Sequence, residues 1–146
     1  MIMAGEVRIP DLIPHAGPMC LLERIVRWDA QSVTTATTSH RAATNPLAVD
    51  GRLHAIHLCE YGAQAMAVHG GLAALARGER ARPGVLVSLR DVTLACEFVE
   101  GFAGELIVEA RRLHDSGAAW QYEFRVEHAG RQLAQGRAIV SVASRS

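Results

Sequence analysis

The pattern of hydrophobic and polar positions divides the chain into a strand-rich start, one long apolar segment and a strand-rich end. Residues 19–28 are mainly apolar, and residues 33–39 alternate small and β-branched side chains, which is typical of a half-buried strand. Residues 53–77 contain no proline and many helix formers. They predict a helix of about 25 residues and roughly 37 Å, with fraying at Gly70-Gly71. Because this helix is apolar nearly all round, we expect it to be buried.

Beyond Pro83-Gly84 the pattern predicts strands, at residues 85–94, 104–114, 120–126 and 133–142. The clearest is 120–126, where aromatic and aliphatic side chains alternate with Gln, Glu and Arg. The turn at 128–131 should join the last two strands as a hairpin. Two strands, one apolar helix and four antiparallel strands require a sheet that curves around the helix. We therefore expect an α+β hotdog fold in a single domain over residues 1–146.

Composition narrows the classes of function. The 15 basic and 15 acidic side chains cancel, which argues against nucleic-acid binding. All the basic residues are Arg, so Schiff-base catalysis by lysine is excluded. The three cysteines lack the CxxC spacing of a zinc site and are odd in number for a disulfide framework. With no signal-peptide pattern at its start and no clean apolar stretch of 18 residues, we expect a cytoplasmic protein without a membrane span, metal or cofactor.

The polar residues of the long apolar segment are the candidates for chemistry. On an α-helix His57, Glu60 and Gln64 fall within roughly 60° of one another. A carboxylate in apolar surroundings is rarely kept without a partner. Glu60 could serve as a general acid or base, or it could form a structural ion pair with an arginine. His54 and His57 could polarise or deprotonate a substrate, or they could be packing residues.

Two motifs resemble those of a known family. Residues 12–25, LIPHAGPMCLLERI, resemble the N-terminal motif of bacterial 3-hydroxyacyl-ACP dehydratases, approximately L-P-H-x-x-P-(F/M)-L-L-(V/L)-D-R-(V/I). Residues 59–65, CEYGAQA, are similar to that family's E-x-M-A-Q-A core, with Gly62 where Met is usual. The resemblance covers almost the whole chain. It is strongest to the divergent dehydratase-like proteins of aryl-polyene biosynthesis clusters, whose helix often follows a loop such as Asp50-Gly51-Arg52-Leu53.

The resemblance implies a substrate and a set of site residues. The substrate would be an acyl thioester carried by acyl carrier protein or coenzyme A. Glu60 matches the family's acid, which protonates the departing 3-hydroxyl. Gln64 matches the glutamine that follows the acid, and Ala55 replaces the glycine that opens the family's helix. We expect Gln64 and Ala55 to contact substrate.

One departure from the family leaves three functions open. The family's base is a histidine in a His-Phe-Pro loop, whereas this chain has Asn45-Pro46-Leu47 at the corresponding distance before Glu60. The protein is therefore a dehydratase that uses His54 or His57 as base, a thioesterase that uses Glu60, or an acyl-carrier-binding subunit that pairs with an active dehydratase. We also expect a homodimer or higher oligomer, because a single hotdog sheet has an open edge strand.

Overall fold

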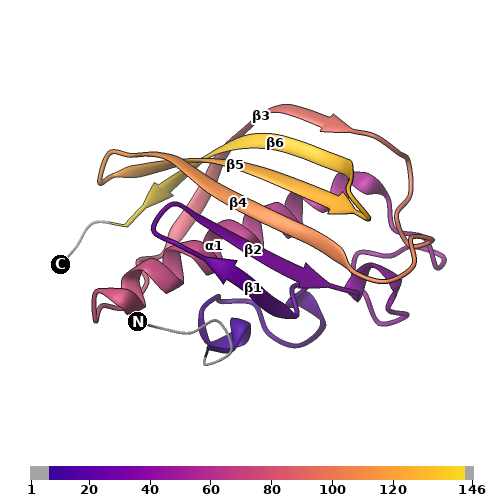
Figure 1. Cartoon of the computed structure of the whole chain (residues 1–146), viewed down its shortest axis with the longest axis horizontal. Coiled ribbons are helices and arrows are strands. Elements are labelled where there is room, and N and C mark those ends of the chain that lie inside the picture. The colour runs from indigo at the N-terminus through magenta and orange to yellow at the C-terminus, as the bar shows by residue number, and fades with distance from the viewer. Residues whose placement is uncertain (1–6, 144–146) are drawn as a thin grey trace.

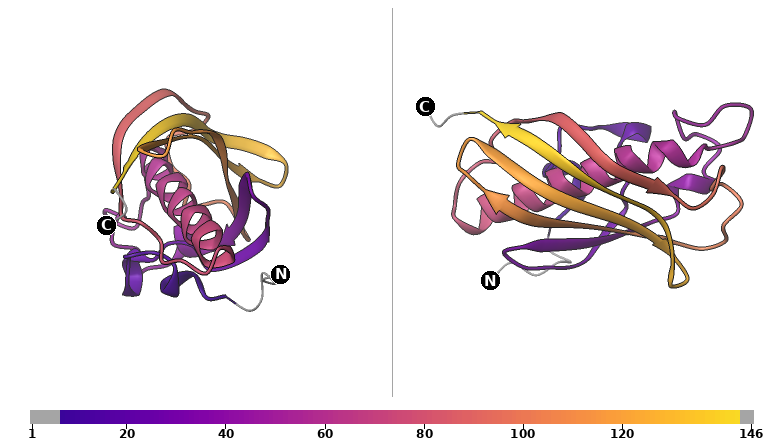
Figure 2. Two further views of the ribbon diagram at one scale, coloured as in Figure 1. Left: turned by 90° about the vertical axis from the view of Figure 1, so that its left-hand side faces the viewer. Right: turned by 90° about the horizontal axis from the view of Figure 1, so that it is seen from above.

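The computed structural model describes residues 7–143. These residues form one α-helix and six strands: β1 (Arg24–Trp28), β2 (Ser32–Thr37), α1 (Leu58–Ala76), β3 (Gly84–Leu94), β4 (Leu106–Asp115), β5 (Ala119–His128) and β6 (Arg131–Val142). The strands make one antiparallel sheet in the order β1-β2-β4-β5-β6-β3. This sheet curves over α1 (Figure 1), and the view along the helix shows the sheet wrapping it (Figure 2). The predicted hotdog architecture is confirmed.

The predicted strands are present, with changed ends. The hairpin of β5 and β6 turns at Ala129 and Gly130, which both have positive φ. The first strand is shorter than predicted, because residues 17–19 form a 3₁₀ turn and β1 begins only at Arg24. Residues 9–11 form another 3₁₀ turn, in a segment that has prolines at positions 10, 14 and 18.

The predicted helix start at residue 53 is wrong. The Leu53 N–H donates to Glu100 Oε1 at 2.9 Å, and the Ala55 N–H donates to the Glu97 carbonyl at 2.8 Å. These bonds to the loop before β4 keep His54 extended (φ −68°, ψ 141°). A 3₁₀ turn over residues 55–57 follows, and α1 begins at Leu58 and runs unbroken through Gly70-Gly71 to Ala76.

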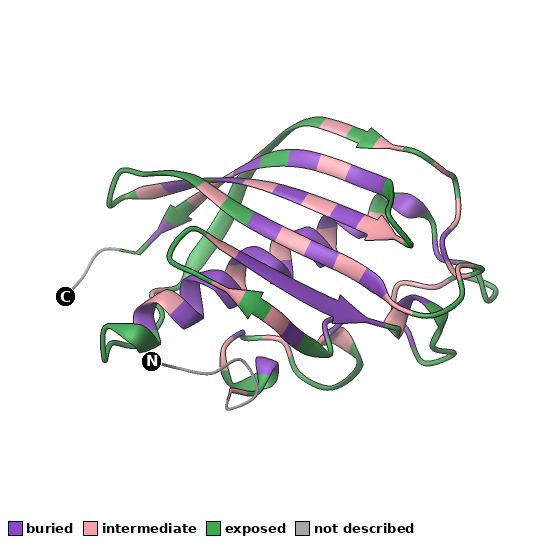
Figure 3. Ribbon diagram, in the orientation of Figure 1, coloured by how far each residue is buried: buried purple, intermediate pink, exposed green. Residues whose placement is uncertain are grey.

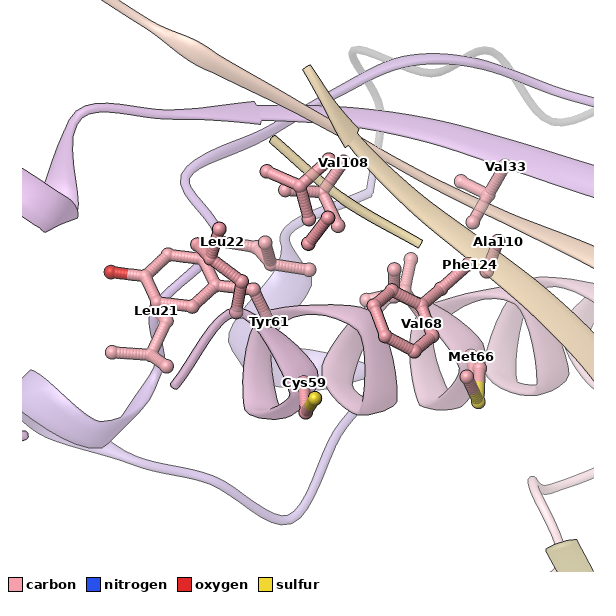
Figure 4. Close-up of a cluster of buried hydrophobic side chains, with 14 of the residues drawn as sticks. Leu21, Leu22, Val33, Cys59, Tyr61, Met66, Val68, Val108, Ala110 and Phe124 are labelled. Atoms are coloured by element: carbon pink, nitrogen blue, oxygen red, sulfur yellow. The ribbon is translucent and has the colours of Figure 1, made fainter. Parts of the chain in front are cut away.

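The main core lies between α1 and the concave face of the sheet (Figures 3 and 4). Tyr61, Val68 and Leu72 of α1 have no exposed surface, and neither does Phe124 of β5. A Cβ atom at Gly62 would overlap the Phe124 ring, and one at Gly136 of β6 would lie 2.7 Å from its Cε1. The Phe124 ring therefore occupies space left by two glycines, which explains why Gly62 replaces the methionine that is usual in the dehydratase motif.

Buried and more exposed residues alternate along β5, as the sequence pattern predicts. Its burial pattern places Trp120, Tyr122, Phe124 and Val126 inside, and the residues between them are half-buried or exposed. The predicted inward face of this strand is confirmed.

Cys20, Cys59 and Cys96 are free thiols. Desolvation by burial raises the pKa of each thiol, which keeps them protonated and poorly nucleophilic. Between residues 7 and 143, no helix is long and apolar enough to cross a membrane.

Candidate active site

A cavity of about 510 Å³ borders one face of α1. The helix contributes Glu60, Ala63, Met66, Ala67, Gly70 and Gly71, and residues from four other regions close the walls: Leu12, Pro14, His15, Ala81, Arg82, Pro83, Gly84, Leu86, Trp120, Tyr122 and Val140. Because α1 rises about 1.5 Å per residue, the stretch from Glu60 to Gly71 follows the cavity for about 16 Å. Most of the lining side chains are apolar or small, and Glu60 and His15 supply a polar end.

Gln64 organises this polar end. It is fully buried, and its Nε2 donates to the Met19 carbonyl at 2.7 Å and to Glu60 Oε1 at 3.1 Å. Its Oε1 accepts the Leu21 N–H at 2.9 Å. One buried amide thus holds the N-terminal segment against α1 and orients the Glu60 carboxyl group. The predicted proximity of Glu60 and Gln64 on the helix is confirmed.

His15 lies beside Glu60. Its Nε2 is 3.2 Å from Glu60 Oε1, and the two side chains are 29% and 34% exposed. His15 Nδ1 is buried and has no hydrogen-bond partner among the described residues. This pair was not predicted from the sequence. The L-I-P-H motif marked the residue, but only folding of the N-terminal segment onto α1 brings its ring to Glu60.

The other predicted site residues lie elsewhere. His54 is exposed, its Nδ1 accepts the Ile56 N–H at 3.0 Å, and its ring contacts Phe98 edge-on. His57 ends the 3₁₀ turn and is half-buried. Ala55 is buried, with its N–H bonded to Glu97. None of the three lines the cavity described above, and their roles in catalysis or substrate binding stay predictions.

Asn45, near the position of the family's catalytic histidine loop, is used to build its own loop. Its Nδ2 donates to the Ser39 carbonyl at 2.9 Å and to the Tyr61 hydroxyl at 3.0 Å, and its Oδ1 accepts the Leu47 N–H at 2.9 Å. The side chain is 7% exposed. Asn45 therefore stabilises the loop and is not among the residues that line the cavity.

A buried network supports the wall of the cavity formed by Tyr122. Arg112 Nε donates to the Tyr122 hydroxyl at 3.2 Å, and this hydroxyl lies 2.7 Å from His69 Nδ1. His69 Nε2 lies 3.1 Å from the Asp29 carbonyl, which can only accept, so Nε2 carries the hydrogen and the Tyr122 hydroxyl donates to Nδ1.

Burial sets the charges of this network. Desolvation lowers the pKa of His69 to about 4 and raises the pKa of Tyr122 to about 12. Both are neutral near pH 7, so Tyr122 in the cavity wall and His69 behind it do not change charge at that pH. Residue spacing does not predict the role of His69, because its partners lie on other elements.

A long helix wrapped by an antiparallel sheet, with a carboxyl group at one end of an apolar cavity, defines a hotdog protein of the type that handles acyl groups. The chain belongs to the ApeP-like family, described as ApeP dehydratase, whose profile matches residues 7–145. The resemblance to dehydratase-like proteins seen in the sequence is confirmed.

Similar solved structures support the fold. A chain of the dehydratase heterocomplex ApeI:P from Xenorhabdus doucetiae is 24% identical with a TM-score of 0.84, over 95% of this chain and 93% of that one. A hypothetical thioesterase with coenzyme A from Streptococcus pneumoniae TIGR4 is 12% identical with a TM-score of 0.61, over 84% and 86%. The E. coli PaaI protein from the phenylacetic acid degradation operon is 16% identical with a TM-score of 0.58, over 80% of each chain. No curated protein sequence matches the chain.

Proposed function

We propose that the protein dehydrates 3-hydroxyacyl thioesters and that Glu60 donates a proton to the departing hydroxyl. The observation that carries this proposal is the position of Glu60, held by Gln64 at the polar end of a cavity of about 510 Å³ whose other walls are mainly apolar. Such a cavity suits an acyl chain with one reacting polar end. Membership of the ApeP-like dehydratase family supports the same reaction.

The chemistry needs two proton transfers. The C2–H bond breaks, a C2=C3 double bond forms, and the C3–O bond breaks as the hydroxyl leaves as water. Glu60 in its protonated form supplies the proton to that oxygen, and a second group removes the proton from C2. His54 and His57 are the sequence-based candidates for the second group.

We infer that the substrate is a thioester of the pantetheine type, carried by acyl carrier protein or coenzyme A. The similar Streptococcus pneumoniae protein is described with coenzyme A, and a protein from Streptococcus mutans is described as bound to acetyl coenzyme A. These proteins share the fold, which supports a thioester carrier for this chain as well.

We also propose that strand β3 pairs with a second hotdog chain, either another copy or a related dehydratase subunit. β3 is a sheet edge, bonded only to β6 within the described chain. Its Val85, Leu86, Val87 and Leu89 are 64%, 41%, 58% and 41% exposed. The other edge, β1, is five residues long, and its Arg24 is paired with Glu105. An apolar, unpaired edge favours strand pairing, and the similar ApeI:P protein is itself part of a heterocomplex.

Product analysis tests the function. The protein is incubated with the 3-hydroxyoctanoyl thioester of coenzyme A, and the Glu60→Gln variant is compared with Glu109→Gln. Glu109 serves as the control because the alternation of buried and exposed residues along β4 places its side chain on the outer face of the sheet. We expect an enoyl thioester from the wild type, a loss of about 10²-fold or more in Glu60→Gln, and no change in Glu109→Gln. Thermal melts of the three proteins should coincide.

The other outcomes contradict this proposal in different ways. Release of free acid would assign the protein to the thioesterases. Binding of the thioester without any product would favour the carrier-binding subunit. Unchanged turnover in Glu60→Gln with a lowered melting temperature would make Glu60 a structural residue.

A further inference from the structure

The proposed dehydration requires a base, and the structure points to a residue that the sequence analysis left aside. Of the described residues that line the cavity, His15 alone carries an imidazole. The loop that holds the base in related dehydratases contains Asn45 here, whose side chain bonds to Ser39, Leu47 and Tyr61 of α1. A base supplied by this chain must therefore come from another element.

We propose that His15 is the catalytic base and that it forms a proton-exchanging pair with Glu60. This inference rests on the proposed dehydratase function. His15 Nε2 lies 3.2 Å from Glu60 Oε1, and both side chains keep about a third of their surface exposed where they border the cavity. Because His15 Nδ1 has no hydrogen-bond partner among the described residues, Glu60 is the group that determines where the ring carries its proton.

The fold holds the ring in place. Pro14 precedes His15 and Pro18 lies in the 3₁₀ turn that follows, so the backbone on both sides has little freedom. Gln64 then binds the backbone of Met19 and Leu21. The same side chain bonds to Glu60, so one residue orients Glu60 and anchors the segment that carries His15. Such pre-positioning of an acid and a base is a large part of general acid–base catalysis.

The pair can complete a cycle without another proton carrier. In the starting state Glu60 is protonated, and His15 is neutral with its hydrogen on Nδ1 and none on Nε2. His15 Nε2 takes the C2 proton, the C–H electron pair forms the C2=C3 bond, and the C3–O bond breaks as Glu60 gives its proton to the leaving oxygen. Water and the enoyl thioester depart. The imidazolium then returns its proton to the carboxylate across the 3.2 Å contact, which restores the starting state.

Turnover of His15 variants is the first part of the test. His15→Gln and His15→Ala are compared with His114→Gln, an exposed histidine near the end of β4, on the 3-hydroxyoctanoyl thioester of coenzyme A. We expect His15→Gln to lower kcat by about 10²-fold or more with little change in KM, and His114→Gln to be unchanged. Added imidazole should restore part of the activity of His15→Ala but not of His15→Gln, a response that a purely structural role would not produce.

Covalent labelling is the second part. A 3-alkynoyl thioester that loses its C2 proton and is reprotonated at C4 becomes an allene, and the nearby base then adds to C3. Peptide mapping should find this label on His15. A label on His54 or His57, or full turnover in His15→Gln while Glu60→Gln is inactive, would overturn the assignment and leave the dehydratase function intact. Absence of both enoyl product and label in the wild type would instead reject the dehydratase function itself.

Discussion

The two long faces of helix α1 are built from similar small and apolar residues, yet they meet different surroundings. On the packed face, Tyr61, Ala65, Val68 and Leu72 have no exposed surface. On the cavity face, Ala63, Ala67 and Gly70 border an open volume of about 510 Å³ together with Glu60. The difference lies in the opposing residues. Phe124 fills the space in front of Gly62, whereas among residues 7–143 no side chain fills the cavity that Ala63 and Ala67 line. Hydrophobicity alone therefore does not separate a core face from a binding face.

The largest loss of stability should come from replacing Phe124, which packs against the buried face of α1. Replacing Phe124 by Ala removes a fully buried ring between Gly62 and Gly136. Because both neighbours are glycines, no side chain can move into the space, and we expect a loss of about 3–5 kcal/mol in the free energy of unfolding. Urea unfolding measures it, and a loss well under about 1 kcal/mol would contradict the packing described here.

The second-largest loss of stability should come from acidification, which protonates the buried His69 of α1. The pKa of His69 is lowered from 6.5 to about 4, mainly by desolvation, so the unfolded chain binds more protons than the folded chain between these values. The stabilisation is complete above pH 6.5 and is lost as the pH falls toward about 4, by up to a few kcal/mol. His69→Gln should be less stable near neutral pH but show a flatter pH dependence. Urea midpoints across this range compare the two, and equal slopes would contradict the role of His69.

A smaller loss in the free energy of unfolding is expected when a methyl group is added to the buried face of α1 at Gly62. Gly62→Ala places a methyl group against the Phe124 ring. The ring is confined by Gly136 on its other side, so the backbone or the ring must shift, which typically costs about 1–3 kcal/mol. The same unfolding measurement applies. A stabilised variant would show that the glycine is not required by packing.

The smallest effect on stability should come from the cavity face. Ala67→Leu adds apolar atoms into open volume, so we expect the free energy of unfolding to change by less than about 1 kcal/mol. Activity should respond instead, because the added side chain occupies space proposed for the acyl chain. The ratio of kcat/KM for an eight-carbon thioester to that for a four-carbon thioester should fall. An unchanged ratio would place the acyl chain outside this cavity.

Much of the fold could be predicted because its signals are local. The alternation at 120–126 and the apolar run at 53–77 identified β5 and α1, and the order of elements gave the hotdog arrangement. The helix start could not be predicted, because Leu53 and Ala55 are held extended by bonds to Glu100 and Glu97. Those partners lie far along the chain and leave no local pattern.

The site was predicted in part for the same reason. Glu60 and Gln64 are both inside α1, so helical spacing brought them together correctly. His57 precedes Leu58 and belongs to a 3₁₀ turn, where the spacing of about 100° per residue no longer holds. The contact of His15 with Glu60 depends on long-range bonds made by Gln64, which residue spacing does not encode.

The exposed side of strand β3 has a consequence for how the protein is produced. Val85, Val87 and the neighbouring leucines form an exposed apolar ribbon on an edge strand that pairs only with β6 among residues 7–143. Such a strand joins any compatible edge that it meets, which leads to insoluble material. If β3 pairs with a related dehydratase subunit, as proposed, chains made in excess over that subunit should be lost to precipitation. A host that makes both chains together, in equal amounts, should yield more soluble protein than one that makes this chain alone.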